Sequence, residues 1–577
     1  MTIGLFTTSS KVLFWAGLVS ISAATYAQST YYVASSGNDS NNGRSADAPF
    51  QSLNKVNSIA LQPGDQVLFR RGDTFRGTLQ IRQSGTSAQP IIFDGFGSGN
   101  RPVLAGSVPI SNWNNIGGNI WEANASALGS QVTGVFRNGA VLPLGRYPNA
   151  DAPNRGYLTI QSHSGKTQLT SKEALPTNFV GGEAVDRPVQ WIINRSRITQ
   201  QSGNTLTLNN GGTYDLGDNW GYFIQDHPAT LDQNGEWYYN PGNKTLRIYD
   251  GGNPNDQLIT ATAFASGVSI SGVSNIIMRN LTITQTLNTG VLIENGTGIT
   301  LAGSEVTNSG EDGLIARGSG NTILVENNLI EEVNNNGVTI TGYQNFTFRG
   351  NTLRRVGLRP GRGKSGDGTY IGFNSVLTDR VTVENNVVDQ IGYNGINFTT
   401  GTTIQRNRVS NYCVTKSDGG GLYIWNGNRQ AMNNVRILSN IVYNGIGAPE
   451  GTPGGAYSGA NGIFLDDCTV DVEIRDNTVF NNRGLGIFMH GSQTAQLINN
   501  TSFNNEEAQL AVNSRNGGCS PRDNVILNNV LVSRLASQLV TKYESHLNDL
   551  PSFGLFDNNI YARPFNDQFK IRAVYNP

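Results

Sequence analysis

Residues 381–398 read VTVENNVVDQIGYNGINF, and this stretch holds both features that decide the fold. Apolar and polar residues alternate up to Asn386, and an Asn-Gly pair at 394 and 395 precedes a second alternating stretch. Alternation with a period of two predicts short β-strands, and an Asn-Gly pair can turn the backbone through positive φ. The stretch therefore predicts two strands that meet at a corner.

The same phrase of apolar, polar, apolar and then asparagine recurs along the second half of the chain. The closest phrases are 21 residues apart, from Asn386 to Asn407, and 23 apart, from Asn328 to Asn351. A period of this length indicates stacked coils, so the sequence predicts an all-β chain that folds as a parallel β-helix. The asparagines that end the phrase are Asn280, Asn328, Asn351, Asn386, Asn407, Asn440, Asn477, Asn500 and Asn529.

A second column of Asn-Gly or Asp-Gly pairs marks the predicted corners of the coils. After each corner, one alternating set is apolar and is expected inside the helix, while the other set points outward. Because neighbouring coils lie about 4.8 Å apart, Trp425, Asp466 and His490 should form a row on the outer face. The corner pairs begin at Asp312, Asn336, Asp367, Asn394, Asp418 and Asn461. The other outward residues are Thr339, Tyr370, Asn397, Tyr423, Phe464 and Phe488.

Insertions interrupt the coils at three neighbouring places. A regular coil has 9 residues between the anchor asparagine and the corner glycine, as from Asn386 to Gly395. This distance grows to 17, 12 and 22 residues before Gly368, Gly419 and Gly462. Insertions in a solenoid form loops on one face, and such loops commonly build its binding surface. We therefore expect a site at this edge.

Composition and net charge exclude some classes of binding partner. Of 577 residues, 70 are glycine and 14% are charged, with a formal net charge of -1, so no basic excess favours nucleic acid or an anionic membrane.

Residues 1–27 resemble a signal peptide, and no later apolar run reaches the roughly 20 residues of a spanning helix. We expect a secreted, periplasmic or cell-surface protein. The sequence does not indicate its oligomeric state.

The rest of the chain is predicted to form three parts. Residues 28–109 form a cap and the first coils, with a short helix over Phe50 to Ala60 and a strand at Val67 to Phe69. Residues 110–258 form a β-rich inserted module whose aromatic residues make its own core, and residues 259–577 form the main β-helix. Three cysteines are an odd number, so at least one has no intramolecular disulfide; we expect all three to be small buried hydrophobic residues.

Several longer phrases carry a family resemblance. They are YYVASSGNDSNNGRSADAPFQSLNKV (31–56), PGDQVLFRRGDTF (63–75), LGRYPN (144–149), LDQNGEWYY (231–239), SDGGGLYIW (417–425) and GIFLDDCTV (462–470). By these phrases the chain resembles the secreted bacterial right-handed parallel β-helix carbohydrate-active proteins. Within them it is most similar to the glycoside hydrolase family that contains α-L-fucosidases and xylanases. The resemblance implies catalysis by acidic residues on neighbouring coils, which by motif are Asp418 and either Asp466 or Asp467.

The predicted register leaves the partner of Asp418 open. Asp466 lies five positions after the corner residue Asn461, which displaces it from Asp418 by roughly 15 Å along the strand. Paired carboxylates in glycosidases lie about 5 to 10 Å apart. Asp367, two coils from Asp418 in the same predicted column, would be roughly 10 Å away.

Three functions remain as hypotheses. The first is a glycoside hydrolase without a metal, in which Asp418 works with Asp466, Asp467 or Asp367, His490 tunes the acids, and Tyr370, Tyr423 and Trp425 contact sugar rings. The second is a polysaccharide lyase, in which Arg362 and Lys364 neutralise a uronate and Asp367 and Asp466 could hold calcium. The third is a β-helix protein that binds polysaccharide or oligosaccharide without catalysis.

Overall fold

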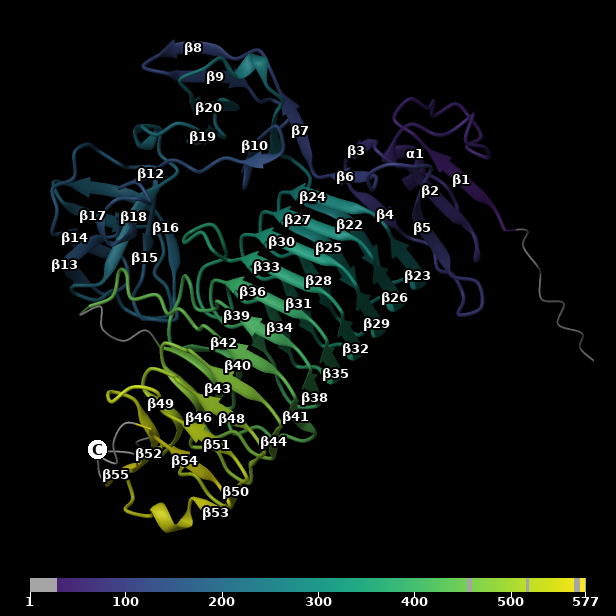
Figure 1. Cartoon of the computed structure of the whole chain (residues 1–577). Coiled ribbons are helices and arrows are strands. Elements are labelled where there is room, and N and C mark those ends of the chain that lie inside the picture. The colour runs from purple at the N-terminus through teal and green to yellow at the C-terminus, as the bar shows by residue number, and fades with distance from the viewer. Residues whose placement is uncertain (1–27, 454–458, 515–517, 565–570, 576–577) are drawn as a thin grey trace, which may run out of the picture.

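The computed structural model describes residues 28–453, 459–514, 518–564 and 571–575. The predicted signal peptide lies outside these ranges. The chain forms an elongated stack of coils, and a lobe of antiparallel strands lies beside the N-terminal half of the stack (Figure 1). No helix within the described ranges has the length and apolar content of a membrane span.

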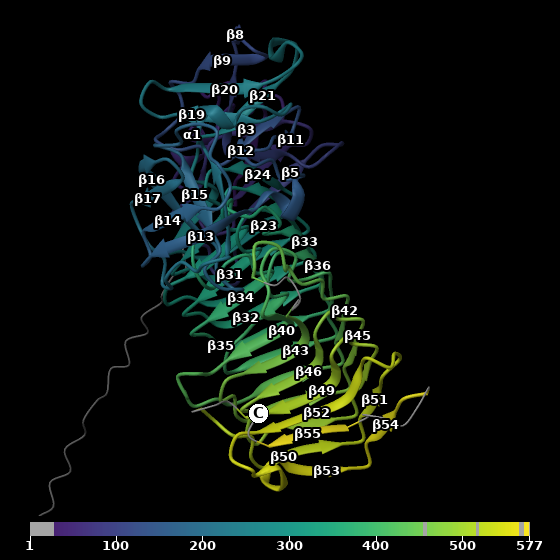
Figure 2. The ribbon, with the colours of Figure 1, turned by 90° about the vertical axis from the view of Figure 1, so that its left-hand side faces the viewer.

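Three parallel sheets form the faces of the stack and confirm the predicted fold class. One sheet has 14 strands, from β1 (Thr30–Val33) to β53 (Gly554–Asp557), and another has 13, from β3 (Thr74–Arg76) to β54 (Ile560–Ala562). We call the third sheet the site sheet (Figure 2). Its 13 strands in order are β4 (Leu79–Ile81), β22 (Ser266–Ser271), β25 (Thr289–Glu294), β28 (Leu314–Arg317), β31 (Val338–Thr341), β34 (Phe373–Val376), β37 (Ile396–Asn397), β40 (Gly419–Trp425), β43 (Ala460–Asp466), β46 (Leu485–His490), β49 (Ala508–Asn513), β52 (Leu539–Ser545) and β55 (Ile571–Tyr575).

The repeated asparagines form a buried ladder inside the coils. The backbone N–H of Asn386 donates to Oδ1 of Asn407 at 3.0 Å, and Nδ2 of Asn386 donates to the same oxygen at 2.9 Å. Asn407 repeats both bonds to Asn440 in the next coil. Each rung satisfies polar groups that would otherwise be buried without partners, which explains why asparagine recurs at this position. The ladder residues are Asn328, Asn351, Asn386, Asn407, Asn440, Asn477, Asn500 and Asn529.

The alternation along the site sheet sorts inside from outside as predicted at β37, β40 and β43, but Tyr370, predicted to point outward, is buried. Leu422 pairs with Ile396 on one side and with Ile463 on the other, and all three side chains are buried. Trp425 pairs with Asp466, and a contact between Asp466 and His490 continues the row. The predicted outer row is confirmed.

The corner column differs from the prediction at two places. Backbone hydrogen bonds place Ile371, and not Asp367, between Asn336 and Asn394. In the same way Gly420, and not Asp418, pairs with Asn461. Both aspartates therefore lie in the loops before the corners. Three successive glycines at 419–421 explain the second error, because any of them can take a corner position.

The cap and the lobe account for the N-terminal half. The predicted helix is shorter than expected, α1 (Leu53–Asn57), and begins after Ser52, whose side chain accepts the Lys55 N–H. The expected strand is β2 (Gln66–Arg70). Between β7 (Ser107–Ile110) and β21 (Ile259–Thr262) the strands pair antiparallel, and one sheet closes on itself through a pairing of β18 with β15. The strands of this small barrel are β13 (Leu158–Ser164), β14 (Gln168–Ser171), β15 (Glu183–Asp186), β16 (Asn194–Ser202), β17 (Thr205–Leu208) and β18 (Gly221–Gln225), and β12 (Arg146–Tyr147) pairs with β18 outside the closed circuit.

The barrel contacts all three inserted loops. The N–H of Gly366 donates to the carbonyl of Ile193 at 3.1 Å, and the N–H of Ser417 donates to the carbonyl of Gln190 at 3.1 Å. Near the third loop, the N–H of Gly221 donates to the carbonyl of Gly451 at 2.8 Å. The insertions therefore serve as the docking surface of the barrel as well as the edge of the site sheet.

The cysteines correct a second prediction. Cys468 and Cys519 form a disulfide with their Cα atoms 5.2 Å apart, so they are not merely small hydrophobic residues. Cys413 is free and buried, as the odd number requires of at least one.

Candidate active site

A cavity of about 610 Å³ lies where the inserted loops meet the site sheet. Strands β40, β43 and β46 supply its floor, and the barrel supplies part of its wall. Aspartates and aromatic side chains dominate the lining. The main lining residues are Trp191, Tyr214, Asp367, Tyr393, Asn394, Asn397, Phe398, Asp418, Tyr423, Trp425, Phe464, Asp466, Asp467, Phe488 and His490.

Asp418 lies in the loop before β40 with positive φ, and its surroundings favour the protonated acid. The hydroxyl of Tyr393 donates to the Asp418 backbone carbonyl at 2.8 Å and fixes the loop. Among the described residues, none donates a hydrogen bond to the Asp418 carboxylate. Burial, followed by the negative charge of Asp466, raises the pKa of Asp418 to about 6. Asp418 therefore carries a proton in mildly acidic solution, when most carboxyl groups are ionised.

Asp466 has the opposite surroundings. The hydroxyl of Tyr423 donates to its Oδ2 at 2.7 Å, and Nδ1 of His490 lies 3.1 Å from its Oδ1. Burial, together with Asp466, raises the pKa of Tyr423 well above its ordinary value, so the hydroxyl keeps its proton and donates it. The two aspartates share one cavity but differ in their hydrogen bonds: Asp466 accepts the Tyr423 hydroxyl, whereas none of the described residues donates to the Asp418 carboxylate.

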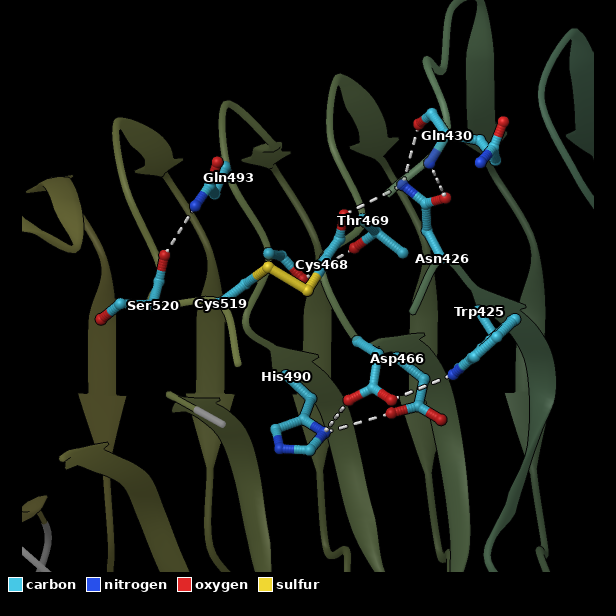
Figure 3. Close-up of a disulfide and its surroundings, with 12 residues drawn as sticks. Trp425, Asn426, Gln430, Asp466, Cys468, Thr469, His490, Gln493, Cys519 and Ser520 are labelled. Atoms are coloured by element: carbon cyan, nitrogen blue, oxygen red, sulfur yellow. Dashed lines mark hydrogen bonds and ion pairs between the residues drawn. A yellow bond between two sulfur atoms is a disulfide. The ribbon is translucent and has the colours of Figure 1, made fainter. Parts of the chain in front are cut away.

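Asp467 holds the end of β43 in place. Its Oδ2 accepts a hydrogen bond from the Trp425 indole at 3.0 Å, and Nδ1 of His490 lies 3.4 Å from its Oδ1. The disulfide begins at the next residue, Cys468, and links this coil to Cys519 (Figure 3). Figure 3 shows His490 and Trp425 turned toward the carboxylates from either side. Asp467 thus positions the Trp425 indole, whereas Asp466 accepts the Tyr423 hydroxyl.

Asp367 lines the same cavity but is exposed. Its carboxylate accepts the N–H of Gly368 at 2.8 Å. The fully buried Lys416 holds this loop, because its ammonium donates to the Gly366 carbonyl at 3.1 Å and to Oγ1 of Thr369 at 2.8 Å. Burial lowers the pKa of Lys416 to about 7. The two aspartate loops are therefore connected beneath the cavity.

Three predicted substrate contacts lie elsewhere. Tyr370 is wholly buried and its hydroxyl accepts the Gly361 N–H, so it offers no face to a sugar. The Arg362 guanidinium donates to the Thr133 carbonyl at 2.7 Å, within the contact between loop and lobe. Lys364 pairs with Asp312 at 2.9 Å. Sequence could not foresee the partner of Arg362, because Thr133 belongs to the lobe, a distant part of the chain.

Two residues that line the cavity were assigned by sequence to the core of the module. Trp191 and Tyr214 come from the lobe, and their rings meet at right angles with centroids 5.6 Å apart. Neither belongs to a repeated phrase, so the sequence carries no signal for them.

The charge of the cavity lining limits the class of ligand that can bind there. Of the described residues that line the cavity, four are aspartates and none is lysine or arginine. Asp466, Asp467 and His490 place possible metal-ligand atoms within 4.8 Å of one another. These side chains also contact Tyr423, Trp425 and one another. The cavity could take a neutral ligand or a cation, whereas a lone anion would meet like charge.

Comparison with known protein families identifies the repeated part of the chain. A family model described as "Right handed beta helix region" matches residues 247–413 and 362–530. The chain therefore contains a right-handed parallel β-helix. A solved structure named "Glycoside hydrolase" aligns over 94% of this chain and 97% of its own, with 13% identity and a TM-score of 0.60. That likeness supports the fold.

A solved complex of XylC with xylose aligns over 93% of this chain and 86% of its own, with 13% identity and a TM-score of 0.49. Lacto-N-biosidase of Bifidobacterium longum subsp. longum is 39% identical over 105 residues. This match covers 17% of the chain and 6% of that protein.

Proposed function

We propose that the protein is a glycoside hydrolase that cleaves a neutral oligosaccharide or polysaccharide at the cavity above β40 and β43. The carrying observation is the contrast between Asp418, whose pKa is raised to about 6, and Asp466, which accepts a hydrogen bond from Tyr423 and faces His490. Glycoside hydrolysis uses one carboxyl group that carries a proton and a second carboxylate, and the raised pKa of Asp418 suits it to the first role.

In this proposal Asp418 is the general acid. Its proton passes to the glycosidic oxygen as the bond between that oxygen and the anomeric carbon breaks. The leaving-group sugar keeps the oxygen and departs with a hydroxyl group. Asp466 attacks the anomeric carbon or removes a proton from the water that does so. In either route one water is consumed and its hydroxyl ends on the anomeric carbon. His490 positions Asp466, and Tyr423 stabilises its charge through the hydroxyl hydrogen bond.

The relatives support a carbohydrate substrate. The stretch shared with lacto-N-biosidase is 39% identical, and the solved structure that aligns over most of the chain is named a glycoside hydrolase. The resemblance to the family that contains α-L-fucosidases and xylanases agrees with both names.

The lyase is the weaker proposal. It needs a cation or a basic side chain beside the substrate carboxylate, but Arg362 and Lys364 are engaged in contacts outside the cavity. Four aspartates line the described cavity without any arginine or lysine, which disfavours an anionic polymer.

The disulfide between Cys468 and Cys519 supports an exported protein, because disulfides persist in oxidising compartments.

One assay separates the candidate functions. The purified protein is incubated with fucosylated, xylan, pectic and alginate polymers while new reducing ends and the ultraviolet absorbance of unsaturated uronates are recorded. We expect reducing ends without absorbance from a neutral polymer. Absorbance together with reducing ends from pectin or alginate would identify a lyase. Polymer binding with neither signal would identify a binding protein.

A further inference from the structure

The barrel places two aromatic side chains in the cavity wall, opposite the strands that carry the acids. Trp191 is partly buried against the large hydrophobic core that includes the interior of the β-helix, whereas Tyr214 remains 40% exposed. Their perpendicular contact, with ring centroids 5.6 Å apart, holds the exposed ring of Tyr214 against Trp191. Packing of the barrel alone does not account for Tyr214, because none of the described hydrophobic clusters includes it.

The backbone around Trp191 is fixed at two points beside the acids. On one side, the carbonyl of Gln190 accepts the N–H of Ser417, the residue before Asp418. On the other side, Ile193 forms an isolated bridge with Gly366, the residue before Asp367. Trp191 lies between these two contacts, so docking of the barrel sets its position relative to both aspartate loops.

The chemistry of these rings suits a sugar. Pyranose rings have apolar C–H faces, and tryptophan and tyrosine offer flat apolar surfaces with one polar edge. Trp425, which is 46% exposed, supplies a third aromatic ring to the same cavity from β40. Ligand sites combine such apolar walls with a few polar groups, as this cavity does.

We propose that Trp191 and Tyr214 form a sugar-binding subsite, contributed by the barrel, for a unit of a neutral oligosaccharide next to the one that is cleaved. This inference rests on the proposed function for the class of ligand. It assigns a role in substrate recognition to the inserted lobe, which the β-helix alone would lack. The subsite makes affinity depend on oligosaccharide length.

Binding to a variant that does not turn over tests the proposal. In an Asp418→Asn background, calorimetry measures the Kd of xylo-oligosaccharides and of fucosylated oligosaccharides of two to six units. We expect Tyr214→Ala and Trp191→Ala each to weaken binding of the longer ligands by about tenfold, which corresponds to about 1.4 kcal/mol. Tyr214→Phe and Trp191→Phe should retain most of the affinity because they keep a flat ring.

A matched control is Tyr238→Ala, which removes a partly buried tyrosine of the lobe that does not line the cavity. It should change Kd less than twofold. Unchanged binding in Tyr214→Ala, which alters an exposed side chain and should fold, would overturn the subsite even if Trp191→Ala failed to fold. Absence of binding by every oligosaccharide would also overturn it. Tyr214-dependent binding in a protein that shows no hydrolysis would retain the subsite and refute the proposed function.

Discussion

The regular coils and the interrupted coils of the β-helix differ in what they add to the same framework. Along the regular part, residues that pair in successive strands are 23 or 24 positions apart, as from Val291 to Leu314 and on to Val338. Along the interrupted part, the step grows to 35 from Val338 to Phe373 and to 41 from Leu422 to Ile463. The strands stay in register throughout. The extra residues form loops that carry aspartates and hold the lobe.

This difference separates the residues that determine the fold from those that make the site. The asparagine ladder repeats from Asn328 to Asn529, with Ser304 rather than Asn280 before it, and the apolar interior repeats from coil to coil, so both describe the framework. Asp418, Asp466 and Trp191 occur once each and meet only where the loops gather. Changes in the framework should therefore reduce stability, and changes in the interrupted coils should reduce activity.

The largest effect is expected from the two acids. Asp418→Asn and Asp466→Asn should each lower kcat/KM by about 10²- to 10⁴-fold on the polymer that the protein cleaves, the range for loss of acid–base catalysis. The folded structure should persist, because asparagine has nearly the same shape. Initial rates of reducing-end release measure the effect.

The matched control for the acids is Asp379→Asn. Asp379 is exposed in the 14-stranded sheet, does not line the cavity and pairs with Arg380, so its loss should change kcat/KM less than about twofold. Full activity in Asp418→Asn would remove Asp418 from the mechanism.

A ladder substitution should show the reverse pattern. Asn407→Ala removes the acceptor of two hydrogen bonds from Asn386 and leaves those donors buried without partners. We expect the free energy of unfolding to fall by about 2 to 4 kcal/mol, measured by urea denaturation, with near-normal kcat/KM in the folded protein. Asn54→Ala, at an exposed position of α1, is the control and should have little effect. A neutral Asn407→Ala would show that the ladder is dispensable.

Asp418→Asn should also change stability, in a direction that depends on pH. The pKa of Asp418 is about 6 in the fold and near 3.8 when unfolded, so ionisation costs the native state stability as the pH rises through this window. Asparagine cannot ionise. The variant should therefore be more stable than the parent by about 1 to 3 kcal/mol at pH 7, after allowance for partial exposure, and the gain should vanish near pH 4. Urea denaturation at both pH values tests this, and an equal difference at both would contradict it.

The smallest effect is expected from removal of divalent cations. Asp466, Asp467 and His490 are held by hydrogen bonds within the protein, so dialysis against a chelator should change kcat/KM less than about twofold. Addition of calcium to the dialysed protein is the companion measurement. Loss of activity that calcium restores would favour the lyase.

Sequence patterns predicted the framework because each coil repeats the same physical problem. Alternation placed Leu422 and Ile463 inside and Trp425 and Asp466 on one outer row, and the structure agrees. The asparagine spacing located the coils. These features depend on local period, which a single sequence displays.

The site was harder to predict because it depends on long-range contacts. Any of the three glycines at 419–421 can take the corner position, so the sequence predicts Asp418 at the corner, whereas Gly420 occupies it. Because of this register error, the distance between Asp418 and Asp466 could not be judged from the sequence. Trp191 reaches the cavity from a lobe more than 200 residues earlier in the chain. The sequence predicts Arg362 as a substrate contact, whereas its guanidinium binds the Thr133 carbonyl of the lobe. No sequence pattern indicates that the lobe packs on this loop.

The pH dependence of kcat/KM tests the central claim most directly, namely that Asp418 acts as a protonated acid in the cavity that it shares with Asp466. Because the proton of Asp418 is lost as the pH rises through its pKa of about 6, kcat/KM of the native protein should fall about tenfold per pH unit above that value. Asp418→Asn should lack this alkaline limb. A native profile that stays flat from about pH 5 to pH 8, or the same limb in the variant, would contradict the account.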